Sequence, residues 1–246
     1  MTSRQPTIGR DAVLFPDVPA SGKADAPSKV GHGVIYAAEL NIPAEALNEY
    51  RLGMEALHKN DFKPAEKHLE RATELYPKYS SAFNSLGVAY QRDPERQDAP
   101  APGQTSAILR SSAAKGAFRQ ALALNPNNAE AATNLGIMLM NEGEPAEAER
   151  LLRIAEAIRP DRIEIAVGLM LAELKLRHFE DVLATARRLP RGAEKKFPVI
   201  HLARGAALEA RSEAKEAAKE YREFLKRTND ASQAGWVQAA LQRMEK

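Results

Sequence analysis

The sequence predicts an all-α fold of antiparallel helix pairs, and three observations indicate it. Gly53 and Gly87 are 34 residues apart, and Pro126 and Pro160 are separated by the same interval, so a unit of that length recurs. Of the 246 residues, 44% are hydrophobic and 28% charged, which is typical of a folded, helix-rich chain. Only 6% are aromatic while alanine is abundant, which favours closely stacked helices over one large core.

Residues 129–162 are the clearest copy of the repeated unit. Its first half carries small and apolar residues at one-turn spacing, namely Leu135, Gly136 and Leu139. Its second half carries the apolar set Ala148, Leu151, Leu152 and Ala155, and Pro160 ends it. The copy is therefore predicted to form two helices joined by a turn at 141–144.

The glycines inside the first helices need a packing explanation, because glycine in a helix interior costs on the order of 1 kcal/mol. Gly53, Gly87, Gly136 and Gly205 each occupy the same place in their repeat. A residue without a side chain is needed where two helices cross closely. We therefore expect each glycine to mark the crossing point of a helix pair.

The first copy, residues 46–79, repeats these residue types around a second turn. The matching residues are Leu52, Gly53, Phe62, Ala65, Leu69, Ala72 and Pro77. The pattern resembles the tetratricopeptide repeat, a helix-turn-helix unit. The resemblance covers about 200 of the 246 residues. It implies a right-handed superhelical solenoid whose first helices line a concave groove that binds protein partners.

The repeat spacing divides the chain into five units. They are residues 46–79, 80–128, 129–162, 163–196 and 197–230, followed by a capping helix at 231–246 that carries Trp236. The second unit holds 15 extra residues, because Ala114 and Phe118 follow their counterparts by 49 rather than 34. The fourth departs from the pattern, since Leu169 and Met170 stand where leucine and glycine are expected.

The extra residues form a proline-rich polar segment at 92–105, which predicts a loop between the two helices of the second unit. Thr105 or Ser106 is predicted to cap a lengthened helix that begins near Ala107. Two interpretations of the loop remain open. It is either a neutral solvated insertion, which costs little closure entropy, or a lip beside the groove that touches the partner.

The N-terminal part has a different composition. Residues 1–33 are rich in proline, glycine and polar residues and predict a flexible tail. Residues 34–45 form a lead-in segment with a short β-prone strip, and Pro43 lies near the start of the first helix. The sequence as it stands shows no signal peptide and predicts a cytoplasmic protein; the alternative is a periplasmic or envelope-associated location after removal of a leader.

Several kinds of chemistry find no support in the sequence. The chain has no cysteine, its five histidines form no metal-ligand spacing, and it has no glycine-rich phosphate loop. We therefore expect no catalytic site, no cofactor and no metal. The formal charge of +2 gives no footprint for nucleic acid, and no apolar run is long enough for membrane insertion.

The resemblance assigns binding to exposed side chains of the first helices in the first three units. The candidate groove residues are Tyr50, Arg51, Met54, Asn84, Ser85, Val88, Thr133, Asn134 and Ile137. Two asparagines in this set can pair with a peptide backbone, and the apolar members offer adaptable contacts. Chaperone C-terminal tails do not fit, because the clamp of chaperone-binding members needs Lys, Asn and Arg where this chain has Tyr50, Met54, Ser85, Glu130 and Asn134.

The sequence thus favours a non-catalytic scaffold that binds a peptide segment or helix of another protein in the groove. The alternative is a structural component that self-associates or stacks in an envelope complex through its ends or convex face. In that alternative, Leu169 and Met170 would form part of a contact edge.

Overall fold

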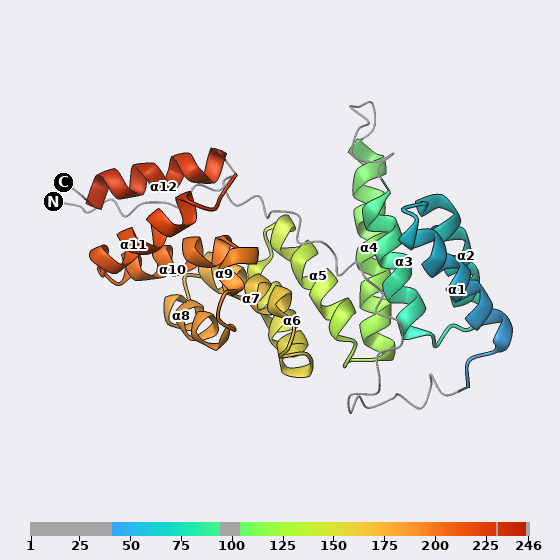
Figure 1. The fold of residues 1–246 in the computed structure, drawn as a ribbon. Helices are drawn as coiled ribbons and strands as arrows, with labels where there is room; N and C mark the ends of the chain where they lie inside the picture. Colours follow the sequence, from blue (N-terminus) through green and yellow to red (C-terminus); the bar gives the residue numbers. More distant parts are fainter. Residues whose placement is uncertain (1–40, 94–103, 230, 245–246) are drawn as a thin grey trace. The chain divides into compact units, whose positions relative to one another are not determined.

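The computed structural model describes residues 41–93, 104–229 and 231–244, and all regular structure in these ranges is helical (Figure 1). The described residues divide into two compact units, and the division falls between Met138 and Leu139. The N-terminal unit contains α1 (Ala44–His58), α2 (Phe62–Leu75), α3 (Ser80–Arg92), α4 (Gln104–Leu124) and most of α5 (Ala129–Glu142). The C-terminal unit contains the end of α5 and then α6 (Pro145–Ile158), α7 (Ile163–Lys175), α8 (Phe179–Arg188), α9 (Ala193–Lys196), α10 (Val199–Ala210), α11 (Ala214–Leu225) and α12 (Ala231–Met244).

In the N-terminal unit, helices pack against their neighbours in sequence. α1 lies along α2, α3 lies along α4, and α2 joins the two pairs by packing against α3. One apolar cluster between them centres on Leu57, Leu69 and Leu86, and a second includes Tyr79 and Ala82. This pattern of nearest-neighbour contacts is the one that a repeat architecture requires.

In the C-terminal unit, α7 is the most enclosed helix, and its residues 165–174 are all buried. α6, α8 and α10 pack against it. α10 also packs against α8, α9 and α11, and α12 packs against α11. A helix that is apolar around its whole circumference is expected at such a central place.

Three helix pairs cross where a glycine of the first helix faces a large side chain of the second. A Cβ atom added to the glycine would lie 2.6 Å from Leu69 at Gly53, 2.5 Å from Phe118 at Gly87 and 2.5 Å from Tyr221 at Gly205. Leu69 and Tyr221 follow their glycines by 16 residues, whereas Phe118 follows Gly87 by 31. The excess equals the 15 inserted residues and places them between α3 and α4, as the sequence predicts.

Four turns inside helix pairs share one backbone geometry. A residue one or two positions after the first helix has positive φ, at 57° for Asn60, 84° for Gly143, 64° for Arg177 and 65° for Ser212. The next amide donates to the carbonyl oxygen five residues earlier, as from Asp61 to Ala56 at 2.9 Å and from Glu213 to Leu208 at 3.0 Å. This is the Schellman arrangement, which satisfies carbonyl groups left open at a helix end.

Helix boundaries differ from the prediction in the third and second units. The turn predicted at 141–144 is wrong in its extent, because α5 continues to Glu142 and the break comes at Gly143. The predicted helix start near Ala107 is also wrong. α4 begins at Gln104, so Thr105 and Ser106 lie inside the helix rather than capping it.

The structure adds one element that the sequence did not predict. This is the short helix α9, which follows Gly192, whose φ is 88°. Pro43 takes the N-cap position of α1, where its φ is −57°. The tail at 1–33, most of the lead-in at 34–45 and residues 94–103 of the inserted loop lie outside the described residues.

Leu169 and Met170 are buried within the chain, with 0% and 1% of their surfaces exposed. The small residue of this helix is Gly168, which directly precedes Leu169. A Cβ atom added to Gly168 would lie 3.4 Å from Leu152 of α6. The idea that Leu169 and Met170 form an exposed contact edge is therefore wrong, because both side chains are already enclosed by α7's neighbours.

Candidate functional site

The nine candidate residues all lie in the N-terminal unit, on three first helices of successive pairs. We call this set the first-helix surface. α1 supplies Tyr50, Arg51 and Met54, α3 supplies Asn84, Ser85 and Val88, and α5 supplies Thr133, Asn134 and Ile137.

Asn84 and Asn134 are brought together directly by the fold. Nδ2 of Asn134 donates a hydrogen bond of 3.0 Å to Oδ1 of Asn84, and both side chains are half-buried. This bond leaves the amide donors of Asn84 and the carbonyl oxygen of Asn134 for other partners. The two residues therefore present amide donors and a carbonyl acceptor side by side.

The apolar members of the first-helix surface pack on the core beneath it. Tyr50, Met54 and Val88 are partly buried against the cluster that contains Leu69 and Leu86. The ring of Tyr50 also lies 4.9 Å from that of Tyr79, centroid to centroid, at an interplanar angle of 44°. These side chains consequently hold fixed positions and contribute both packing and surface.

The remaining members contribute unequally. Ser85 is only 6% exposed and offers little surface. Arg51 is exposed and engaged on its own helix, by a 3.1 Å hydrogen bond to Asn48 and a 3.6 Å ion pair with Glu55. Thr133 donates from Oγ1 to the carbonyl oxygen of Ala129 at 2.7 Å, and Ile137 is half-buried.

A buried polar connection that supports this surface was not foreseen from the sequence. Asn128 accepts a 2.9 Å hydrogen bond at Oδ1 from the amide of Ala131, so it caps the start of α5. Its Nδ2 donates to Oγ of Ser80, and Ser80 donates to the carbonyl oxygen of Ala121, both at 2.9 Å. The spacing N-x-x-A before a helix indicates the cap, but nothing in the sequence pairs Asn128 with Ser80.

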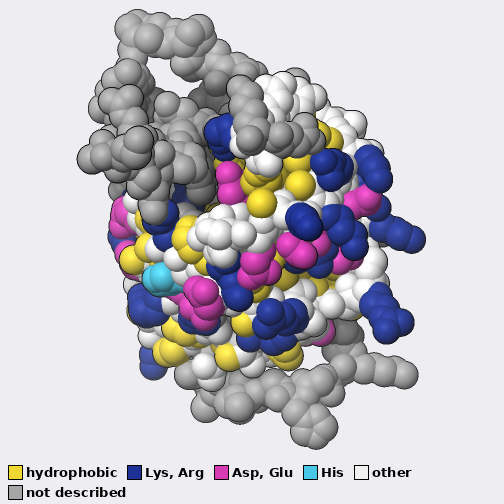
Figure 2. All heavy atoms as spheres, turned by 90° about the vertical axis from the view of Figure 1, so that its left-hand side faces the viewer, with side chains coloured by type: hydrophobic (Ala, Val, Ile, Leu, Met, Phe, Trp, Pro, Cys, Tyr) yellow, Lys and Arg dark blue, Asp and Glu magenta, His cyan; other side chains and the backbone are white. Residues whose placement is uncertain are grey.

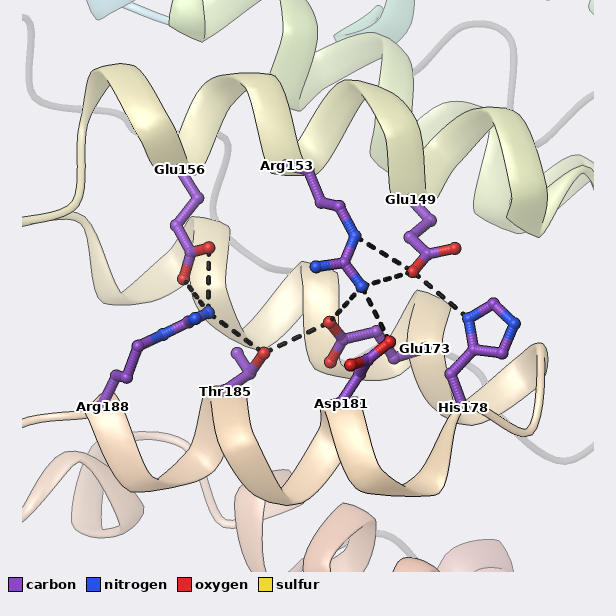
Figure 3. Close-up of polar contacts among 8 residues, drawn as sticks. All are labelled: Glu149, Arg153, Glu156, Glu173, His178, Asp181, Thr185 and Arg188. Carbon is purple, nitrogen blue, oxygen red and sulfur yellow. Dashed lines mark hydrogen bonds and ion pairs between the residues drawn. The ribbon is translucent and has the colours of Figure 1, made fainter.

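A second polar cluster lies in the C-terminal unit and centres on Arg153 of α6 (Figure 3). Its Nη2 lies 2.7 Å from Oε1 of Glu149, 3.0 Å from Oδ2 of Asp181 and 3.2 Å from Oε1 of Glu173. At the other end of the cluster, Arg188 pairs with Glu156 at 2.9 Å (Figure 3). Side chains of α6, α7 and α8 are joined by these contacts.

Glu173 is the buried member of this cluster, with 0% of its surface exposed. Oε1 accepts a 3.2 Å hydrogen bond from Thr185, while Oε2 is buried with no hydrogen-bond partner. Burial raises the pKa of Glu173 from 4.5 to about 7, although Thr185 and Arg153 oppose the shift. Burial also acts to raise the pKa of Glu149, but Arg153 and His178 hold that pKa below its usual value.

Three members of the cluster have the geometry of metal ligands. Glu149, His178 and Asp181 each offer one ligand atom within 4.8 Å of the others. The guanidinium of Arg153 already contacts the carboxylates of Glu149 and Asp181, so it supplies the positive charge that a cation would bring. We therefore assign the cluster to holding α6 and α8 together over α7.

Within the described ranges, no helix is both long enough and apolar enough to span a membrane. A search among curated proteins finds no match. Two models of the tetratricopeptide repeat match the sequence, over residues 50–113 and 110–174. Together they span just over half of the 246 residues.

Solved structures share the fold at low sequence identity. YrrB, described as a TPR protein with an unusual peptide-binding site, has a TM-score of 0.61 and 15% identity over 79% of this chain and 92% of its own. MamA from Desulfovibrio magneticus RS-1 has a TM-score of 0.58 and 16% identity, over 76% of this chain and 96% of its own. PilF of Pseudomonas aeruginosa has a TM-score of 0.58 and 18% identity, over 81% of this chain and 88% of its own. With an all-α helical-repeat fold, two matching repeat models and these structural neighbours, the chain belongs to the tetratricopeptide repeat family.

Proposed function

We propose that the chain is a non-catalytic scaffold that binds an extended or helical segment of another protein on the first-helix surface. Its family supports the general role, because tetratricopeptide repeat proteins are protein–protein interaction scaffolds. The structural neighbour YrrB is described as having a peptide-binding site, and a peptide segment is the partner class that we propose here.

The hydrogen-bonded pair of Asn84 and Asn134 is the observation that carries this proposal. A peptide group has one N–H donor and one C=O acceptor. The pair retains one free acceptor and free donors after its mutual bond of 3.0 Å, so its unused groups complement those of a peptide backbone. Turning both amides over leaves the same complement, so the proposal does not depend on their orientation.

Apolar contacts supply the second part of the proposed affinity. Met54 and Val88 are half-buried, so each still offers part of its side chain to a partner. Their packing on the core limits the rotamer entropy lost when a partner binds. We therefore expect moderate affinity, spread over several contacts rather than concentrated in one residue.

The structural alternative, stacking through the fourth repeat, lacks the feature that suggested it. Leu169 and Met170 are buried in the chain, as described above. We retain only the scaffold as the proposed function.

A peptide selection tests the proposal without a known partner. Random 12-residue peptides displayed on phage are selected on the wild-type chain, and the binders are titrated against the double variant Asn84→Ala/Asn134→Ala. The proposal expects affinity to fall at least about tenfold, because two backbone hydrogen bonds are lost.

Asn127→Ala is the matched control, because Asn127 is an exposed asparagine before α5 that lies outside the candidate set. It should bind the selected peptides as the wild type does. Circular dichroism of all variants confirms that helix content is unchanged. Binders whose affinity survives the double substitution would remove the first-helix surface from the proposal.

A further inference from the structure

A cavity of about 230 Å³ opens in the C-terminal unit, between α8, α10 and the start of α11. Its apolar wall consists of Leu183 and Ala186 of α8 and Leu208 of α10. Leu183 and Ala186 are buried, and Leu208 is half-buried. The volume is below the roughly 300–1,000 Å³ of small-molecule sites and suits a single side chain with its neighbour.

The polar wall of this cavity is rich in arginine. It is made by Arg187, Arg204, Arg211 and Glu213. Nε of Arg211 pairs with Oε1 of Glu213 at 2.7 Å. Arg204 is fixed more firmly, because Glu220 and Glu194 bind its guanidinium at 3.0 and 3.2 Å.

Arg187 differs from these residues. It is exposed at the end of α8, and within the described part of the chain no carboxylate or other acceptor engages its guanidinium. The polar wall therefore holds one positive charge that is not neutralised locally, and this charge lies beside the apolar wall. Figure 2 shows one face of the molecule, on which Lys and Arg side chains lie among acidic and apolar ones.

We propose that this cavity is a second binding site, which takes an extended acidic segment of a partner protein. An aliphatic side chain enters between Leu183 and Leu208, and a carboxylate of the same segment pairs with Arg187. Charge complementarity argues for the acid, because Arg187 is the wall residue with an open guanidinium. The apolar wall argues for the aliphatic residue, because an aliphatic side chain gains free energy when it is buried there.

The distance between the apolar wall and Arg187 determines how far apart the two binding residues of the segment are. Leu183 and Arg187 are four residues apart on α8, so they lie on one face about 5–6 Å apart. In an extended peptide, residues i and i+2 point to the same side about 6.6 Å apart. The segment therefore carries an aliphatic residue and an acidic residue two positions apart.

Methyl NMR with a defined peptide tests this proposal on the full chain. The probe is acetyl-Gly-Leu-Ala-Glu-Gly-amide, whose blocked ends leave the glutamate as its only carboxylate. We expect the leucine methyl signals of Leu183 and Leu208 to shift and saturate, with a Kd on the order of 1 mM. Replacing the probe's Glu by Gln, or its Leu by Ala, should each weaken binding about three- to tenfold.

Charge-matched variants of the protein separate this site from general attraction. Arg187→Gln should weaken binding of the acidic probe about three- to tenfold and leave the Gln probe unchanged. Arg150→Gln removes the same charge from an exposed position on α6 and should bind the probe as the wild type does. The two methyl spectra without peptide confirm that both variants keep the fold.

Two results would overturn the proposal. One is the absence of saturable shifts at Leu183 and Leu208 with the acidic probe. The other is stronger binding of acetyl-Gly-Leu with a free terminal carboxylate, which would assign the site to chain ends rather than to an internal acidic segment. Neither result bears on the first-helix surface, since that surface lies in the other unit.

Discussion

Asn134 donates a 3.0 Å hydrogen bond to Asn84, fifty residues earlier in the chain, and thereby connects α5 to α3. An asparagine in a helix usually points to solvent or competes with the backbone for hydrogen bonds. Here two of them, one from each of two successive repeats, satisfy each other on a half-buried surface. The polar centre of the proposed binding surface is thus assembled by the stacking of repeats.

We predict that Gly87→Ala destabilises the chain by about 1–3 kcal/mol, because the new Cβ atom would lie 2.5 Å from the ring of Phe118. Gly116→Ala in the partner helix α4 is the control. A Cβ atom there meets nothing within 4 Å, so this change should stabilise by about 0.5–1 kcal/mol. Urea denaturation followed by circular dichroism measures both, and equal effects would mean that the Gly87 crossing is not tight.

Because the turns share one geometry, we predict that substitutions at two equivalent positions change the stability in opposite directions. Ser212 has φ of 65°, which costs free energy for a residue with a side chain, so Ser212→Gly should stabilise by about 0.5–1 kcal/mol. Gly143 has φ of 84° in the equivalent turn, and Gly143→Ala should destabilise by about 1 kcal/mol. Midpoints of denaturant unfolding at unchanged slope provide the measurement, and shifts of the same sign would contradict the account.

Glu173 should make the stability of the C-terminal unit depend on pH. Its pKa is about 7 when folded against 4.5 ordinarily, so the folded state binds the proton more tightly. The resulting stabilisation is fully present below pH 4.5 and is lost as the pH rises through 7. Since each pKa unit is worth 1.36 kcal/mol, the difference between 4.5 and about 7 sets an upper limit of about 3 kcal/mol, and we expect a loss of about 1–3 kcal/mol.

Glu173→Gln tests this prediction, because the amide cannot ionise. Urea unfolding between pH 5 and pH 8 should show a smaller decline with pH in the variant than in the wild type. Glu149 and Glu220, whose pKa values are lowered, contribute in the opposite sense, and they are common to both proteins and cancel. Glu180→Gln, at an exposed carboxylate of α8, should keep the wild-type slope; an unchanged slope in Glu173→Gln would contradict the prediction.

Trp236 should report whether α12 stays docked on α11. It is the only tryptophan and lies edge-on to Tyr221, with ring centroids 5.7 Å apart. Val237 beside it is fully buried, so Val237→Asp should release the helix and shift tryptophan emission to longer wavelength. Gln238→Asp, at an exposed position, should leave the emission unchanged. An unshifted maximum for Val237→Asp would show that α12 is not the cap of the last repeat.

Much of the fold was predictable because its determinants are local and periodic. Gly53, Gly87 and Gly205 recur at the helix crossings, and the displacement of Phe118 locates the insertion. Turn details were less accessible. Asn60, Arg177 and Ser212 adopt the same positive φ as Gly143, although a side chain disfavours it, so only the tertiary arrangement reveals the shared turn.

The candidate site was predictable as a set of positions but not as a set of contacts. The repeat register placed Asn84 and Asn134 on first helices, yet their mutual hydrogen bond depends on how α3 and α5 stack. The repeat register likewise did not show that Ser85 is buried. The cluster around Glu173 had no sequence signal, because its contacts join residues up to 32 positions apart and its members resemble ordinary surface charges.

The most direct test of the central claim observes the two asparagine side chains themselves. In ¹⁵N-labelled protein, the Nδ2 amide signals of Asn84 and Asn134 are followed while a phage-selected peptide is added. We expect both signals to shift with the same Kd as the peptide, and those of the exposed Asn127 to stay in place. Saturable binding that leaves the signals of Asn84 and Asn134 unmoved would contradict a peptide site on the first-helix surface.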